Sequence, residues 1–169
     1  MQKKDTLAKW LNRIGIIIMV CLVLLCLPVV IPKLMGYGLY EVATGSMEPE
    51  YPVGSILYVK EALPSEVEVG DAITYTMGTD TNKVMTHRVI DINEEEAYFI
   101  TKGDANEVVD MDPISFERLI GKPVFCLKGM AVVVNFIHSK TGILTIGTLF
   151  LLVILLWSVA DSRKKADKK

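Results

Sequence analysis

The sequence predicts a mainly β domain, a small barrel or sandwich, flanked by two transmembrane helices. Two uncharged apolar runs lie at residues 14–32 and 141–160 of the 169-residue chain. A helix needs about 20 residues to cross the roughly 30 Å hydrocarbon layer of a bilayer, so both runs are long enough to span it. The segment between them is rich in short β-type stretches separated by turn residues. This length accommodates one domain and its anchors.

The first apolar run, Ile14 to Pro32, is predicted to remain as an anchor. Its 19 uncharged residues exceed the apolar core of a cleaved signal peptide, which is usually about 7–15 residues. The second run, Thr141 to Ala160, has 20 uncharged residues but includes Gly142 and Gly147. We predict that it also spans the membrane.

The region between residues 37 and 130 is predicted to be β structure. Its candidate strands are rich in β-branched and aromatic residues: Ser55–Val59, Ala72–Tyr75, Met85–Ile92 and Ala97–Ile100. Turn chemistry separates them at Pro52-Val53-Gly54, Gly70-Asp71, Gly78-Thr79-Asp80 and Asn93-Glu94-Glu95. Many short strands at close spacing favour a barrel or sandwich, with a single helical turn predicted within Ile114–Ile120.

The charge distribution predicts the orientation in the membrane. Residues 33–140 carry 9 Lys and Arg against 17 Asp and Glu, whereas the two ends carry 9 against 3. Lys and Arg are retained on the cytoplasmic side of short loops. We therefore predict cytoplasmic tails at 1–13 and 161–169, transmembrane helices at 14–32 and 141–160, and an extracytoplasmic domain at 33–140. The basic residues of the tails are Lys3, Lys4, Lys9, Arg13, Arg163, Lys164, Lys165, Lys168 and Lys169.

Composition argues against several classes of function. A net charge of −2 gives no support for nucleic-acid binding, whereas the two apolar runs make the lipid bilayer a partner. Cys21 and Cys26 lie inside the first run and Cys126 stands alone, so no disulfide framework or zinc motif is expected. His87 and His138 are the two histidines, and no glycine-rich phosphate loop is present. We predict neither a metal nor another cofactor.

Four residues form a candidate catalytic constellation: Ser46, His87, Asp104 and Asp110. Taken singly, each has an ordinary explanation, such as a Gly-Ser turn, a partly buried histidine, a Gly-Asp turn or a solvated acidic run. Taken together, a serine, a histidine and a carboxylate in one small domain are the parts of an activated nucleophile.

The order of these motifs resembles the type I signal peptidases of the endoplasmic-reticulum class, which occur as the SipW type in Gram-positive bacteria and are also found in archaea. The resemblance covers residues 14 to about 126 and lacks the larger insert of the lysine-type bacterial enzymes. It rests on Ser46-Met47-Glu48-Pro49, Gly70-Asp71-Ala72-Ile73, His87-Arg88, Gly103-Asp104-Ala105-Asn106 and Asp110. Ala105 departs from the asparagine that is frequent there in the family.

The resemblance implies a role for each motif residue. Ser46 is the expected nucleophile, and His87 replaces the lysine base of the other subclass; histidine has an ordinary pKa of about 6.5 and needs no large shift to act as a base. Asp110 is the expected orienter of His87, with Asp104 structuring the site or sharing the role, and the sequence leaves that division open. The oxyanion hole would combine the Ser46 N–H with the Thr44 hydroxyl.

The resemblance also implies the substrate and the location. The expected reaction removes signal peptides from secreted preproteins after small residues of the Ala-x-Ala type, on the outer face of the plasma membrane, with the secretion translocon as a further partner. The candidate pocket residues are Val42, Ile56 and Ile73, for which core packing is the alternative. Two other functions stay open: a non-catalytic membrane-tethered scaffold, and a serine peptidase for another membrane-proximal protein.

Overall fold

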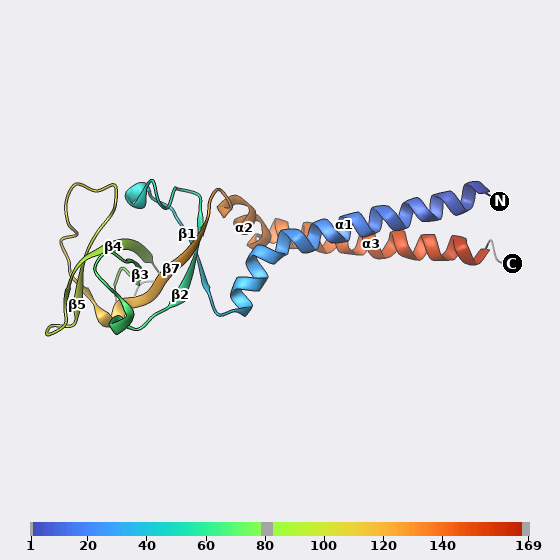
Figure 1. Cartoon of the computed structure of the whole chain (residues 1–169). Coiled ribbons are helices and arrows are strands. Elements are labelled where there is room, and N and C mark those ends of the chain that lie inside the picture. Colours follow the sequence, from blue (N-terminus) through green and yellow to red (C-terminus); the bar gives the residue numbers. More distant parts are fainter. Residues whose placement is uncertain (1, 79–82, 167–169) are drawn as a thin grey trace. The chain divides into compact units, whose positions relative to one another are not determined.

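The computed structural model describes residues 2–78 and 83–166, and contacts divide the chain into two compact units. One unit comprises the residues up to 30 and those from 133 onward, and the other comprises residues 31–132. Figure 1 shows the helices and strands of both units. Part of the predicted turn at Gly78-Thr79-Asp80 lies outside the described residues, as do Lys168 and Lys169 of the predicted tail.

The first unit is helical. It contains most of α1 (Gln2–Leu34), α2 (Ala131–His138) and α3 (Lys140–Ala166). Segments Thr6–Leu34 and Lys140–Arg163 are long and apolar enough to cross a membrane. The α3 helix begins where the Ser139 hydroxyl accepts a hydrogen bond from the Gly142 N–H at 2.9 Å, which satisfies one free donor of the first turn. The short helix α2 was not predicted from the sequence.

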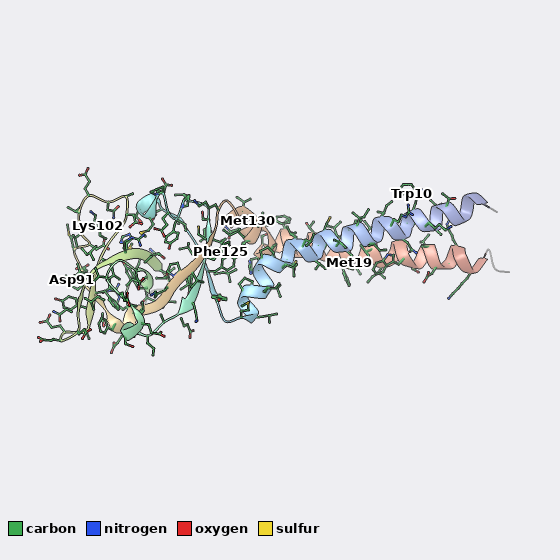
Figure 2. All side chains as sticks on the ribbon, viewed as in Figure 1. Trp10, Met19, Asp91, Lys102, Phe125 and Met130 are labelled. Carbon is green, nitrogen blue, oxygen red and sulfur yellow. The ribbon has the colours of Figure 1, made fainter. Side chains whose placement is uncertain are left out.

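Helices α1 and α3 contact each other through small residues within this unit. A Cβ atom at Gly15 would lie 2.5 Å from Nε1 of Trp157, so only glycine leaves room for the indole. Ala8, Val153 and Ala160 are also buried. Many other apolar side chains of the two helices point outward, including Trp10, which is 56% exposed and labelled in Figure 2. Such an apolar exterior suits lipid better than water.

The second unit is a curled antiparallel sheet of seven strands (Figure 1). The strand order is β1-β2-β7-β3-β4-β5-β6, and every neighbouring pair is antiparallel. The strands are β1 (Gly38–Glu41), β2 (Ile56–Glu61), β3 (Ala72–Thr76), β4 (Val84–Asn93), β5 (Tyr98–Lys102), β6 (Ile114–Ser115) and β7 (Leu119–Leu127). The predicted fold class, a small mainly β domain with two helices capable of spanning a membrane, is confirmed.

The four predicted strands correspond to β2, β3, β4 and β5, whereas β1, β6 and β7 were missed. Three 3₁₀ helices, η1 (Gly45–Met47), η2 (Pro64–Glu66) and η3 (Phe116–Arg118), lie between strands. The last of these falls within the stretch where one helical turn was predicted.

Two apolar clusters hold the sheet together. The first combines buried side chains from β3, β4, β5 and neighbouring segments: Val67, Ile73, Tyr75, Val89, Phe99 and Ile114. The second joins η1 and its following loop to β2 and β3 through Met47, Tyr51, Leu57, Val59 and Ala72. The segment around Ser46 is thus anchored by its neighbour Met47, which is buried in the second cluster.

Candidate active site

Ser46 lies in the middle of η1, directly before the buried Met47. The short helix is closed by a hydrogen bond from the Glu48 N–H to the Gly45 carbonyl, and Tyr51 N–H donates to the Met47 carbonyl at 2.9 Å. Met47 points into the core, whereas the preceding residue, Ser46, is partly exposed. A nucleophile needs this combination of a fixed backbone and an accessible side chain.

His87 connects Ser46 to a carboxylate. It lies on β4, pairs with Ile73 of β3 and is 4% exposed. Its Nε2 atom is 3.1 Å from Ser46 Oγ, and its Nδ1 atom is 2.5 Å from Asp110 Oδ2. A carboxylate accepts hydrogen bonds, so Nδ1 carries the proton in the tautomer that this geometry favours, and Nε2 is left to accept from the serine hydroxyl.

Asp110 follows β5 in the loop that leads to β6. Its Oδ2 atom also accepts a 2.7 Å hydrogen bond from the Thr101 hydroxyl, and its N–H donates to the Thr101 carbonyl at 3.0 Å. Thr101 is a buried residue of β5 that no sequence motif singled out. Ser46, His87, Asp110 and Thr101 therefore form one continuous chain of hydrogen bonds.

Asp104 has a different partner. Both of its carboxylate oxygens accept hydrogen bonds from Arg88, at 2.7 and 2.6 Å. The same guanidinium donates to Glu50 and to the carbonyl of Gly70. These hydrogen bonds to Asp104 raise the pKa of Arg88 although partial burial opposes the shift, and the charge of Glu50 adds to the increase. Arg88 thereby joins the segment after Ser46, the turn before β3 and the loop after β5.

The Gly103–Asn106 loop contacts the backbone of the serine directly. Ala105 N–H donates to the Ser46 carbonyl at 2.9 Å. A Cβ atom at Gly103 would lie 2.7 Å from that same carbonyl oxygen, so this approach requires glycine. The loop that carries Asp104 therefore supports the backbone of Ser46 rather than the ring of His87.

A cavity of about 250 Å³ opens beside Ser46. Of the three candidate pocket residues, Val42 lines this cavity, whereas Ile56 and Ile73 do not. Ile73 is completely buried in the first apolar cluster and Ile56 is 2% exposed, so both side chains serve the core. The sequence did not single out the other apolar lining residues, which include Tyr40, Met47, Tyr51, Leu57 and Met85.

Thr44 and Ser46 also border a second, more polar cavity of about 420 Å³ together with His87, Asn106 and Asp110. Thr44 directly precedes η1, and its side chain makes no capping hydrogen bond to that helix. Thr44 thus lines both cavities beside the serine. Among residues 2–78 and 83–166, no group of three or more His, Cys, Asp and Glu side chains could hold a metal ion.

Comparison with known proteins identifies relatives of this chain. No family model matches it. Signal peptidase I W of Bacillus subtilis (strain 168) is 42% identical over 91 residues, which are 52% of this chain and 47% of that protein. The signal peptidase complex catalytic subunit SEC11C of Homo sapiens and that of Canis lupus familiaris are each 36% identical over 73 residues, 41% of this chain and 37% of those proteins. The chain thus spans half or less of the length of these relatives. The resemblance predicted from the sequence motifs is confirmed: the chain is a homologue of the type I signal peptidases of the endoplasmic-reticulum and SipW class.

Proposed function

We propose that this chain is a membrane-bound serine endopeptidase that removes N-terminal signal peptides from secreted preproteins. The observation that carries the proposal is the line of hydrogen bonds from Ser46 through His87 to Asp110, in a chain 42% identical to Signal peptidase I W over 91 residues. Two helices capable of crossing a membrane would keep this site near the bilayer, where signal sequences end. Preproteins would reach the outer face of the plasma membrane through the secretion translocon.

The positions of the polar atoms support the following reaction. Ser46 Oγ attacks the scissile carbonyl carbon while its proton passes to His87 Nε2. Asp110 holds the imidazole by Nδ1 and stabilises the imidazolium that forms. His87 then returns the proton to the leaving amine, which departs as the mature chain, and a water molecule releases the signal peptide from Ser46 by the same steps.

The negative charge on the carbonyl oxygen needs hydrogen-bond donors in the transition state. The backbone N–H of Ser46 is adjacent to the reacting carbon. Thr44 is the second candidate donor, because it carries a hydroxyl, lies two residues upstream of Ser46 and lines both cavities. We assign it to the oxyanion hole for that reason.

The smaller cavity fits the proposed preference for small side chains before the cut, as in Ala-x-Ala. Strand β1 is an edge of the sheet, and its residues Tyr40 and Glu41 line this cavity together with Val42. An extended peptide paired with such an edge would place alternate side chains in the cavity. Burial raises the pKa of Tyr51 to about 12, with Glu50 acting in the same direction, so this part of the wall stays uncharged.

The proposal is tested by Ser46→Ala in the full chain, purified and reconstituted into lipid vesicles with a preprotein that carries an Ala-x-Ala site. Loss of the nucleophile should lower turnover by several orders of magnitude, about 10⁶-fold in a well-studied serine protease. Ser65→Ala, an exposed serine of η2, is the matched control and should cleave normally. The cleavage site is read from the mass of the mature product.

Normal cleavage by Ser46→Ala would contradict the assignment. An inactive wild type with intact folding would favour the non-catalytic scaffold. Cleavage of other membrane-proximal proteins, without any effect on preproteins, would assign the serine chemistry to a different substrate. A survey of mature N-termini in cells with and without the chain distinguishes these last two outcomes.

A further inference from the structure

The carboxylate of Asp110 is held at a surface loop by a residue from the interior of the sheet. Val109 and Met111, on either side of Asp110, are exposed, and Met111 is 99% exposed. Apolar packing of these neighbours therefore does not fix the position of Asp110. Thr101, in contrast, is 1% exposed on β5, one residue before Lys102, which is labelled in Figure 2.

Thr101 contacts Asp110 twice. Its carbonyl accepts the Asp110 N–H at 3.0 Å, which ties the loop backbone to the strand. Its hydroxyl donates to Asp110 Oδ2 at 2.7 Å, the same oxygen that lies 2.5 Å from His87 Nδ1. A substitution of the side chain alone leaves the backbone tie in place and removes only the second contact.

Core packing alone does not require a hydroxyl at this position. Burial alternates along β5, so Phe99 and Thr101 share the inward face, and Phe99 belongs to the first apolar cluster. A buried hydroxyl needs a hydrogen-bond partner, and an apolar residue of the same shape would avoid that need. Within residues 2–78 and 83–166, the hydroxyl has one partner besides Asp110, the phenol of Tyr75 at 3.5 Å. Burial raises the pKa of Tyr75, so this phenol stays protonated and able to donate to Thr101.

We propose that Thr101 is a positioning residue of the active site. Its hydroxyl fixes the Asp110 carboxylate, which in turn holds the imidazole of His87 in place. This inference rests on the proposed peptidase function. A carboxylate with one fixed donor besides the histidine has fewer orientations to sample, so Nδ1 meets an oxygen that is already in place. Hydrogen bonds to a charged group are also the stronger ones in proteins.

The test compares Thr101→Val, which keeps the shape and loses the hydroxyl, with Thr101→Ser, which keeps the hydroxyl. Thr101→Val should lower kcat by about 10- to 100-fold with little change in KM, the range expected for one hydrogen bond to a charged group. Thr101→Ser should stay within about 3-fold of the wild type. Thr74→Val is the matched control: Thr74 is also completely buried, but its hydroxyl binds Thr86, so its loss should affect thermal stability and not kcat.

A double-mutant cycle separates this role from a merely structural one. If Thr101 acts through Asp110, then Thr101→Val should lower kcat little further in a protein that already carries Asp110→Asn. If the two residues act independently, the fold losses in kcat should multiply. If Thr101→Val fails to fold, Thr101→Ser and Thr101→Ala, which differ by the oxygen atom alone, supply the same comparison.

The inference is overturned if folded Thr101→Val has the kcat of the wild type, if Thr101→Ser is impaired as much as Thr101→Val, or if the losses multiply with Asp110→Asn. These three results count against the role of Thr101 only if the wild type and Thr74→Val both cleave the preprotein. Absence of cleavage in those two proteins would instead refute the proposed function.

Discussion

At the scale of single residues, two aspartates near His87 make different contacts. Asp110 directs Oδ2 at the imidazole, whereas both oxygens of Asp104 are occupied by the guanidinium of Arg88. A paired Arg–carboxylate contact is strong and geometrically specific, so it suits a structural junction. Neighbouring residues of a strand point to opposite faces, which is why His87 and Arg88 reach different carboxylates.

Replacement of each aspartate by asparagine should separate these roles. Asp110→Asn should remain folded and lose turnover, by about 10⁴-fold as in related triads, because an amide can donate to Nδ1 and favour the wrong tautomer. Asp104→Asn should lower the melting temperature more and kcat less, since it breaks the pairing with Arg88. Both quantities are measured on the purified full chain, with Glu95→Gln in an exposed turn as the control for lost charge. A stable but inactive Asp104→Asn beside an active Asp110→Asn would reverse the two roles.

The sequence motifs named Ser46, His87 and Asp110 because each lies in a short segment with its own signature. They could not assign separate roles to Asp104 and Asp110, because these roles depend on which side chains each carboxylate contacts across the sheet. Ile56 and Ile73 were placed in the pocket because inward and outward positions cannot be told apart in β2 and β3, whose first four residues are all buried. Thr101 carries no local signal, since threonine is common in strands.

At the scale of elements, the strands that were missed are those whose sequences depart from an uninterrupted β pattern. Strand β7 contains Gly121 and Pro123, which usually argue against an interior strand. Its register against β2 shifts between Tyr58 and Val59, and this irregularity lies directly beside Pro123. Strand β6 has two residues and β1 has four, too few for a periodic pattern.

The turn before β3 is joined to β7 by Asp71. Its carboxylate Oδ2 accepts hydrogen bonds from the Glu68 N–H at 2.9 Å and from Lys122 Nζ at 2.5 Å. Burial acts to raise the pKa of Asp71, but the contacts with Lys122, the Glu68 N–H and the charge of Arg88 outweigh it, so the pKa lies below its ordinary value of 3.8. The folded state therefore favours the ionised form of Asp71.

Asp71→Asn should lower the melting temperature at neutral pH, with a loss of about 1 kcal/mol at most because both partners are partly exposed. A depressed pKa contributes stability above the unfolded-state value and loses it as the pH falls through the folded-state value. The gap between wild type and Asp71→Asn should therefore narrow below about pH 3.8. Thermal unfolding of both proteins in detergent from pH 7 to pH 3 measures this difference in melting temperature. A gap that stays constant or widens in acid would contradict the role assigned to this ion pair.

At the scale of the whole molecule, charge and hydropathy are distributed in a consistent way. The two candidate spans, Thr6–Leu34 and Lys140–Arg163, expose most of their apolar side chains. The segment between the apolar runs is acidic, with 17 Asp and Glu against 9 Lys and Arg, whereas the chain ends are basic. Retention of Lys and Arg in the cytoplasm would place both ends inside and the β unit outside.

This topology can be tested with single cysteines in a background of Cys21→Ala, Cys26→Ala and Cys126→Ala. A membrane-impermeant maleimide applied to intact cells should label Glu95→Cys, in the exposed turn after β4, because the charge distribution predicts that the acidic domain is outside. It should not label Lys165→Cys near the end of α3 until the membrane is opened by detergent. Labelling of Lys165→Cys in intact cells would place the C-terminal end outside, and α3 would then not complete a second crossing. Protection of Glu95→Cys would place the β unit in the cytoplasm, where Ser46 could not meet the signal peptides of exported preproteins.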